Sequence, residues 1–339
     1  TDYLSIISFS DRAEALIQSS QVNNKTSMKA MVNTMVADGG TEIFRALDEA
    51  MRQVKKNADS NYVNHIILLT DGETYDDPNL SLELADTAVQ KGIGISTMGI
   101  GHEWNDVFLD ELASRTGGSS AYVNSPGAVV RFLNDRVRSL GSSYAERMHV
   151  SIAPDPDIQL ESVFKLMPNP QPVEITKQPL QLGTLENSRP ITLLIQFQMT
   201  SNLQEGFRTM LRLDVTGDIL HEKRQNYKII SDLSIEVAAN PPIEDPPRTI
   251  LDALGKLTLY RMQQKAEAAI QSGNFEEATR RLENLATRLL AAGQENLAAT
   301  AMLEAKRIKS THVLSEEGRK TMKFGTRMLL LSPGEDNNP

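Results

Sequence analysis

Two oxygen-bearing side chains stand where a parallel sheet would hold a ligand. Asp71 follows the apolar run at residues 65–69, and Thr41 follows two glycines and precedes a helical pattern. Ligands of open α/β sheets sit at the carboxyl ends of the strands. A carboxylate and a hydroxyl at neighbouring strand ends suit a hard cation such as Mg²⁺, which takes oxygen ligands in octahedral geometry. The two residues therefore predict a magnesium site.

Each of the two residues also has an ordinary structural interpretation. Asp71 could cap the turn after its strand, because aspartate side chains accept hydrogen bonds from nearby backbone groups. Thr41 could be the N-cap of the helix that follows it, a common position for threonine. Capping and metal contact are compatible, so both interpretations stay open. The five histidines show no spacing that would suit metal ligands.

The elements that must position these residues alternate between strands and helices. Apolar patterns predict strands at residues 3–9, 13–17, 65–69, 94–100 and 120–123. Helical spacing of apolar residues predicts helices at 27–36, from 41 onward, at 80–90, at 106–116 and after Ser125. This alternation is typical of a doubly wound, mostly parallel sheet. We expect this α/β domain to occupy residues 1–143.

Four segments of this region together resemble the von Willebrand factor type A domain. Residues 3–10, 39–41, 66–73 and 95–101 read Tyr-Leu-Ser-Ile-Ile-Ser-Phe-Ser, Gly-Gly-Thr, Ile-Ile-Leu-Leu-Thr-Asp-Gly-Glu and Ile-Ser-Thr-Met-Gly-Ile-Gly. They occur in the order of that family and at about its spacing. The resemblance covers roughly the first 140 residues and rests on the ordered set, because each segment alone is weakly specific.

The resemblance implies a metal-ion-dependent adhesion site with three parts. Thr41 and Asp71 match two of these parts, and the third is an Asp-x-Ser-x-Ser segment that does not occur in this sequence. We therefore expect the domain to be incomplete at its N-terminus, with its first, central strand upstream of Tyr3. Without that strand, or a complementing strand from another chain, backbone groups of the strands at 3–9 and 65–69 would lack partners.

The resemblance further implies recognition of a partner protein rather than catalysis. An Asp or Glu side chain of the partner would complete the coordination of the ion. Mg²⁺ is the expected ion, with Mn²⁺ and Ca²⁺ as alternatives. Loop residues after the two strand ends would form a rim that selects the partner, namely Tyr75, Asp76, Asp77, His102, Glu103 and Trp104. For Trp104, packing in the core is the alternative interpretation.

The pattern changes after the α/β domain. From 144 to 240, apolar residues alternate with polar ones without an intervening helix, which predicts an antiparallel β-sandwich of about six strands. Upstream strands could complete this sandwich as well. A proline-rich linker then leads into a bundle of helices, so that residues 241–331 form a third region. Residues 332–339 are predicted to be disordered.

Two apolar seams and one capping pattern predict the helices of the third region. The first seam contains Phe275, Ala278, Leu282, Leu285 and Leu289, at spacings that place them on one helix face. The second seam runs through residues 297–308. A last helix is expected to begin at Ser315, followed by two glutamates in its first turn, where negative charge is favourable.

Composition excludes several classes of protein. The 339 residues carry a net charge of −9 without a basic cluster, which disfavours a nucleic-acid partner. The chain has no cysteine, so disulfides, thiol catalysis and cysteine-based zinc sites are excluded, and a reducing compartment such as the cytoplasm is favoured. No apolar run approaches the ~18 residues needed to span a membrane.

Two other functions stay open beside a metal-dependent binding protein. One is a Mg²⁺-dependent enzyme, although the sequence has no Gly-x-x-x-x-Gly-Lys-Ser/Thr loop to hold phosphates. The other is a structural scaffold with a non-functional metal site, acting through the sandwich and the helical tail. Self-association of the chain is compatible with either binding function.

Overall fold

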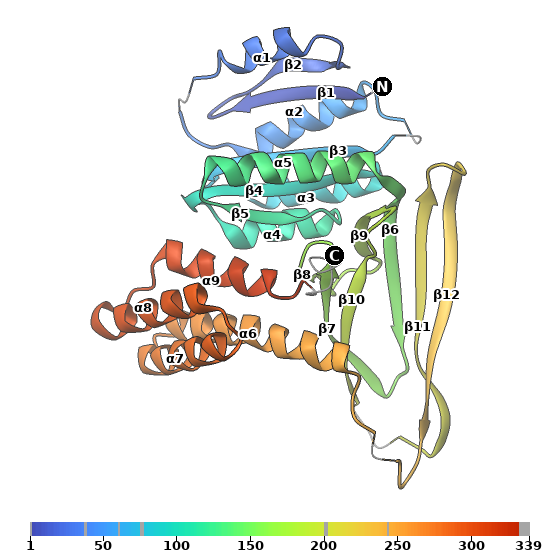
Figure 1. Cartoon of the computed structure of the whole chain (residues 1–339). Coiled ribbons are helices and arrows are strands. Elements are labelled where there is room, and N and C mark those ends of the chain that lie inside the picture. The colour runs from blue at the N-terminus through green and yellow to red at the C-terminus, as the bar shows by residue number, and fades with distance from the viewer. Residues whose placement is uncertain are drawn as a thin grey trace, which may run out of the picture.

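The computed structural model of the protein describes residues 2–36, 39–59, 62–74, 78–199, 203–242 and 244–331. Figure 1 shows three regions. The α/β region carries the N-terminus, long antiparallel strands stand at one side of it, and a group of helices lies below it. The last described helix returns from this group to the α/β region, where it packs against two strands of the sheet.

The α/β region contains two separate sheets. β3 (Asn64–Gly72), β4 (Ile93–Glu103) and β5 (Ser120–Val123) form a parallel sheet in that order. β1 (Tyr3–Phe9) and β2 (Ala13–Gln21) form an antiparallel pair. The predicted parallel sheet is confirmed. Among the described strands, β1 pairs only with β2 and β3 only with β4, and the doubly wound arrangement with an upstream central strand stays a prediction.

The core of this region lies between the strands and three amphipathic helices. These helices are α2 (Ile43–Lys55), α3 (Pro78–Gln90) and α4 (Asp106–Arg115). α2 packs against β1, β2 and β3, and so connects the two sheets. Apolar residues at helical spacing meet apolar strand residues in one cluster, which includes Ile43, Leu47, Met51, Ile66, Leu68, Leu82, Ile95, Phe108 and Leu112.

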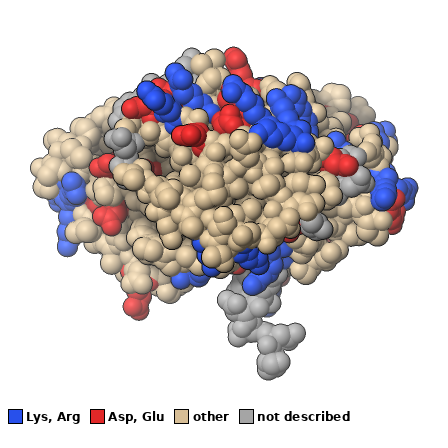
Figure 2. All heavy atoms as spheres, turned by 90° about the horizontal axis from the view of Figure 1, so that it is seen from above, with Lys and Arg blue, Asp and Glu red and all other residues tan. Residues whose placement is uncertain are grey.

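Two further helices differ in how well the sequence predicts them. α5 (Pro126–Gly141) begins as expected, because the Ser125 hydroxyl accepts a hydrogen bond from the Ala128 N–H at 3.3 Å. α1 (Lys25–Val32) is shorter than the predicted helix and buries no residue, so its apolar face does not enter the core. Figure 2 views this end of the molecule and shows a broad area without charged side chains.

Seven strands, one more than expected, form two antiparallel sheets in the middle of the chain. One sheet has the order β10-β7-β8 and the other the order β12-β11-β6-β9. Their bounds are β6 (Ser143–Pro154), β7 (Ile158–Met167), β8 (Gln171–Val173), β9 (Leu180–Glu186), β10 (Thr192–Met199), β11 (Gly206–Ile219) and β12 (Arg224–Val237). The three-residue strand β8 is too short to show an alternating pattern.

Apolar side chains from both antiparallel sheets meet in one cluster. Val150 and Ile152 of β6 and Leu180 of β9 pack there with Val163 of β7 and Val173 of β8. This contact supports the predicted sandwich, which stays a prediction. β12 differs from the other strands because almost every residue along it is exposed, and Figure 1 shows it at the outer edge of the molecule.

The C-terminal region consists of α6 (Arg248–Gln271), α7 (Phe275–Ala291), α8 (Glu295–Thr311) and α9 (Glu316–Met328). Both predicted seams are confirmed, since they supply most of one buried cluster. α9 begins as expected, with the Ser315 hydroxyl accepting a hydrogen bond from the Gly318 N–H at 3.0 Å. Residues 332–339, predicted to be disordered, lie outside the described residues.

Among the described helices, none combines the length and the apolar character that crossing a membrane requires.

Candidate functional site

The structure brings Thr41 close to the end of β3. Asp71 is exposed there, and Gly72 is opposite Glu103 in the β3–β4 ladder, so the ends of the two strands lie side by side. A methyl group placed on Gly72 would lie 2.8 Å from the Thr41 hydroxyl oxygen. A larger residue at position 72 would therefore displace the Thr41 side chain, whose hydroxyl lies directly against the backbone that follows Asp71.

The capping interpretation of Thr41 is wrong in this structure. α2 begins at Ile43, and its N-cap residue Glu42 makes no side-chain capping bond. The Ile43 N–H instead donates a hydrogen bond to the Thr74 hydroxyl at 3.2 Å. Within the part of the chain that the structure describes, the Thr41 hydroxyl has no hydrogen-bond partner, which leaves its oxygen available to a ligand.

The turn between β1 and β2 holds the loop that carries Thr41. The Asp11 carboxylate accepts a hydrogen bond from the Gly40 N–H at 2.8 Å, and the Glu42 N–H donates to the Ser10 carbonyl oxygen at 2.9 Å. Gly39 has a φ of +75°, a backbone conformation that favours glycine. Sequence reasoning missed Asp11, although an aspartate in a three-residue turn is a common acceptor for backbone N–H groups.

The structure places only part of the predicted rim. His102 and Glu103 are exposed at the end of β4, next to the Asp71 turn, and their role in a rim stays a prediction. Trp104 is 1% exposed, so its assignment to the rim is wrong and the packing interpretation is correct. Its ring packs in a three-ring cluster, with its centroid 6.2 Å from that of Tyr122 and 5.9 Å from that of Phe324 on α9. The rim residues Tyr75, Asp76 and Asp77 lie outside the described residues.

Thr41 and Asp71 together supply two oxygen groups. The described residues contain no group of three or more His, Cys, Asp or Glu side chains that could hold a metal ion. A Mg²⁺ site needs about six oxygen ligands, several of which are usually water. The pair therefore fits one part of such a site, and further ligands are required to complete it.

The model of the von Willebrand factor type A domain family matches residues 1–135. A solved structure described as von Willebrand factor type A from Catenulispora acidiphila superposes with a TM-score of 0.75 at 13% identity, over 96% of this chain and 80% of that one. The chain contains a type A domain. This A domain includes β1–β5 and the Thr41–Asp71 pair.

Three other comparisons extend beyond the A domain. Residues 248–332 match the family described as Sll0103-like, C-terminal alpha-helical domain. The Synechocystis protein named uncharacterized protein sll0103 is 27% identical over 98% of this chain and 80% of its own length. The ArnB paralog VWA2 from Sulfolobus acidocaldarius superposes with a TM-score of 0.53 at 16% identity, over 96% of this chain and 78% of its own.

The helix α9 fixes the loop beside the candidate site of the A domain. The Lys320 ammonium donates hydrogen bonds to the carbonyl oxygens of His102 and Trp104, both at 2.6 Å. The ammonium also lies 4.9 Å from the centre of the Trp104 ring. Two carbonyl groups of the rim loop therefore depend on a side chain from the other end of the sequence.

Ion pairs complete this contact, which we call the α9 interface. Asp106 pairs with Arg319 and Lys323, and Asp110 pairs with Arg327 through two hydrogen bonds. Burial alone would raise the pKa of Asp106, but the hydrogen bond from Arg319 and the charge of Lys323 outweigh it and lower the pKa to about 2. Asp106 is therefore fully ionised near neutral pH and holds its two cations.

Proposed function

We propose that the A domain is a protein-binding module that depends on a divalent cation, with Mg²⁺ as the expected ion. The observation that supports it most is the Thr41 hydroxyl, which has no partner among the described residues and lies against Gly72 beside Asp71. A hydroxyl and a carboxylate at the carboxyl end of parallel strands are oxygen donors suited to a hard cation. The A-domain family itself suggests a module for protein interaction.

The residues of the chain have separate tasks in this proposal. Thr41 and Asp71 would hold the ion, and Asp11 positions the loop that carries Thr41 through its bond to Gly40. His102 and Glu103 would contact the partner, held in place by Lys320. A bound Mg²⁺ would supply an open coordination position for a carboxylate oxygen from an Asp or Glu of the partner.

We propose a binding site rather than an active site here. The assigned residues are one carboxylate and one hydroxyl, and the sequence contains no phosphate-binding loop of the Gly-x-x-x-x-Gly-Lys-Ser/Thr type.

We also propose an A domain at 1–143, a two-layer sandwich at 144–240 and a linker with helices at 241–331.

A calorimetric titration of Mg²⁺ into the whole chain tests the metal site. We expect saturable binding that is lost in Asp71→Ala and weakened at least about tenfold, or 1.4 kcal/mol, in Thr41→Val. Asp252→Ala is the matched control, because Asp252 is an exposed aspartate on α6. Equal binding by the wild type and Asp71→Ala would contradict the assigned site.

A capture experiment with the immobilised chain tests the partner. A protein retained in Mg²⁺ should be released by EDTA and should not be retained by Asp71→Ala. Substituting an exposed Asp or Glu of that protein should abolish its retention. Retention that is indifferent to both EDTA and Asp71→Ala would favour a scaffold without a working metal site.

The scaffold function has one observation in its favour. β12 exposes apolar residues along its length, and Leu233 is 51% exposed there. Exposed apolar strands of this kind mark surfaces for association. A scaffold of this type would bind its partners without any divalent cation.

A further inference from the structure

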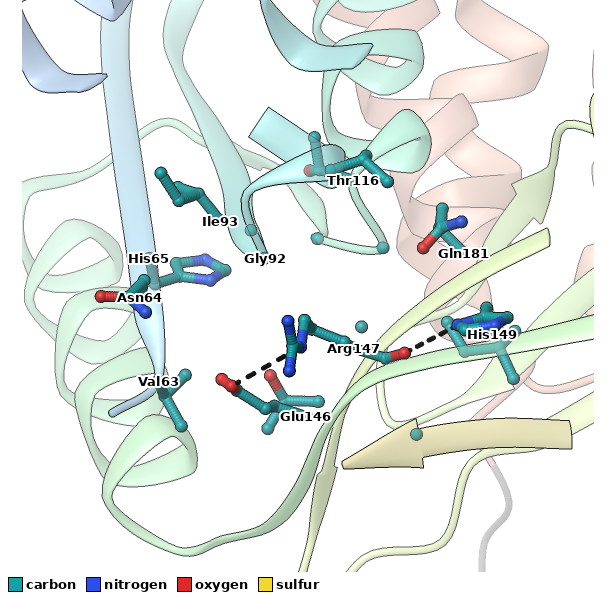
Figure 3. Close-up of a pocket in the computed structure, with 18 of the residues that line it drawn as sticks. Val63, Asn64, His65, Gly92, Ile93, Thr116, Glu146, Arg147, His149 and Gln181 are labelled. Carbon is teal, nitrogen blue, oxygen red and sulfur yellow. Dashed lines mark hydrogen bonds and ion pairs between the residues drawn. The ribbon is translucent and has the colours of Figure 1, made fainter. Parts of the chain in front are cut away.

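A pocket lies at the opposite end of β3 and β4 from the Thr41–Asp71 pair. It has a volume of about 200 Å³ and opens between the A domain and the antiparallel sheets. Figure 3 shows Asn64 and His65 at the start of β3, Gly92 before β4, and Glu146 and Arg147 on β6 around this space. One water needs only about 10–15 Å³ of such volume, so a small molecule fits.

Lys165 lines this pocket and is 3% exposed. Side chains alternate along β7, so Lys165 lies on the same face as the core residue Val163, whereas Phe164 packs on the opposite face beside Tyr260 of α6. Throughout the described residues, the Lys165 ammonium has neither a hydrogen bond nor an ion pair. A buried cation without a partner is costly, which indicates a missing anionic group.

Arg136 of α5 lines the same pocket and is only partly satisfied. Its guanidinium donates to the Ser119 hydroxyl, while its Nε–H is buried and without a partner among the described residues. Two acidic residues favour its charge, Glu186 first and Asp135 second, and the Glu186 carboxylate accepts a hydrogen bond from Ser139 at 2.7 Å. Burial, followed by the charge of Arg136, lowers the pKa of Lys165 to about 7.

The other charged residues of the pocket already have partners. Arg147 forms an ion pair with Asp218, which also accepts a hydrogen bond from the Asn226 N–H at 2.7 Å. The Nε atom of Arg147 lies 3.9 Å from the Oε1 atom of Glu146. Burial raises the pKa of the Glu146 carboxyl group to about 7. The Arg147 cation therefore has carboxylate partners, whereas Lys165 has none among the described residues.

His65 does not supply a balancing charge. Its ring nitrogen Nε2 lies 2.9 Å from the Ser96 hydroxyl. Burial, followed by the charge of Arg136, lowers the pKa of His65 to about 3, so the ring is neutral near pH 7. It remains a polar neighbour for a ligand, whereas Lys165 and Arg136 are the cations without full compensation.

We propose that this pocket binds a small anion with carboxylate or phosphate oxygens, held by the Lys165 ammonium and the Arg136 guanidinium. Both groups favour such anions, the lysine as a point charge and the arginine as a planar donor. The anion enters from solution or is a carboxylate carried by a polypeptide. This proposal is independent of the metal site, because the pocket lies at the other end of the strands.

Calorimetric titrations of the whole chain with inorganic phosphate, succinate and acetylated tetraglutamate test the proposal. We expect saturable binding of at least one probe and affinity at least about tenfold lower in Lys165→Met. Lys177→Met is the matched control, because Lys177 is exposed and pairs with Asp86 outside the pocket. It should bind the probe like the wild type.

The outcomes separate the sources of the anion. Binding of phosphate or succinate identifies an anion from solution, and binding of tetraglutamate alone identifies a polypeptide carboxylate. No binding of any probe, or equal binding by Lys165→Met, overturns the proposal. If Lys165→Met does not fold, Arg136→Gln replaces it with the same expected loss of affinity. The stability of each variant without a probe is measured alongside, so that unfolding is not mistaken for lost binding.

Discussion

Two almost completely buried lysines of this protein have opposite surroundings. Lys320 is 1% exposed in the α9 interface and donates to two backbone carbonyl oxygens of the rim loop. Lys165 is 3% exposed at the pocket between the A domain and the antiparallel sheets, without a partner among the described residues. Burial alone is therefore no guide to the role of a charge. Lys320, whose ammonium has hydrogen-bond acceptors, joins two regions of the molecule. Lys165, which has none among the described residues, points instead to a ligand.

The largest expected effect concerns the acidic partner of the α9 interface. Asp106→Ala removes a buried acidic partner from both Arg319 and Lys323, while Lys323 keeps Asp110 and Arg319 keeps Glu267 and Glu316. We therefore expect a loss of about 3 kcal/mol, at the lower end of the range for breaking a buried ion pair. Urea unfolding, followed by the fluorescence of Trp104, measures this loss of stability. Trp104 is the single tryptophan and lies in the α9 interface, against Phe324.

The matched control for this variant is Asp86→Ala. Asp86 pairs with Arg115 and Lys177 at the surface, where its side chain is 41% exposed. Removing an exposed ion pair typically costs less than about 1 kcal/mol. Equal stability changes for the two variants would show that the ion pairs of the α9 interface contribute no more than surface pairs do.

The sequence predicts the local features of this molecule better than the contacts between its regions. The parallel strands, the α7 seam from Phe275 to Leu289 and the Ser125 and Ser315 caps follow from patterns within about a dozen residues. The proximity of Thr41 to Gly72 follows from the order of strands that the family resemblance implies.

The remaining contacts join segments that are distant in the sequence. Lys323 and Asp106 are 217 positions apart, and Lys323 recurs with Lys320 and Arg327 at helical spacing typical of a solvated helix face. The rim interpretation of Trp104 fails for this reason, since nothing near Trp104 in the sequence predicts that Phe324 of α9 packs against its ring. The pocket likewise needs α5 and β7 to meet, which no local pattern predicts.

The second prediction removes the satisfied lysine. Lys320→Met leaves the carbonyl oxygens of His102 and Trp104 without this donor, and the loss should lower the stability by about 2 kcal/mol, mainly at the buried contact with Trp104. The same unfolding experiment measures this change. Lys309→Met, at an exposed position in the last turn of α8, is the control and should leave stability unchanged. If Lys320→Met left the stability unchanged, the contrast between Lys320 and Lys165 would no longer hold.

Acid should weaken the α9 interface in a defined pH window. The folded-state pKa of Asp106, about 2, lies below the ordinary value of 3.8, so its contribution is complete above pH 3.8 and is lost as the pH falls through about 2. The difference corresponds to about 2 kcal/mol. The stability gap between the wild type and Asp106→Ala should therefore narrow over that window. A gap that is constant from pH 5 to pH 2 would contradict the role of the ionised carboxylate.

The smallest effect concerns Lys165, whose substitution should raise the stability of the chain rather than lower it. Lys165→Met removes a buried charge that has no partner among the described residues, so it should stabilise the ligand-free chain by about 1 kcal/mol at pH 6. The folded-state pKa of Lys165, about 7, lies below 10.5, so the cost of its charge is complete below pH 7 and disappears as the pH rises towards 10.5. The stabilisation should fade over the same interval in urea unfolding. A destabilised Lys165→Met at pH 6, in the absence of any anion, would show that Lys165 supports the fold itself, as Lys320 does.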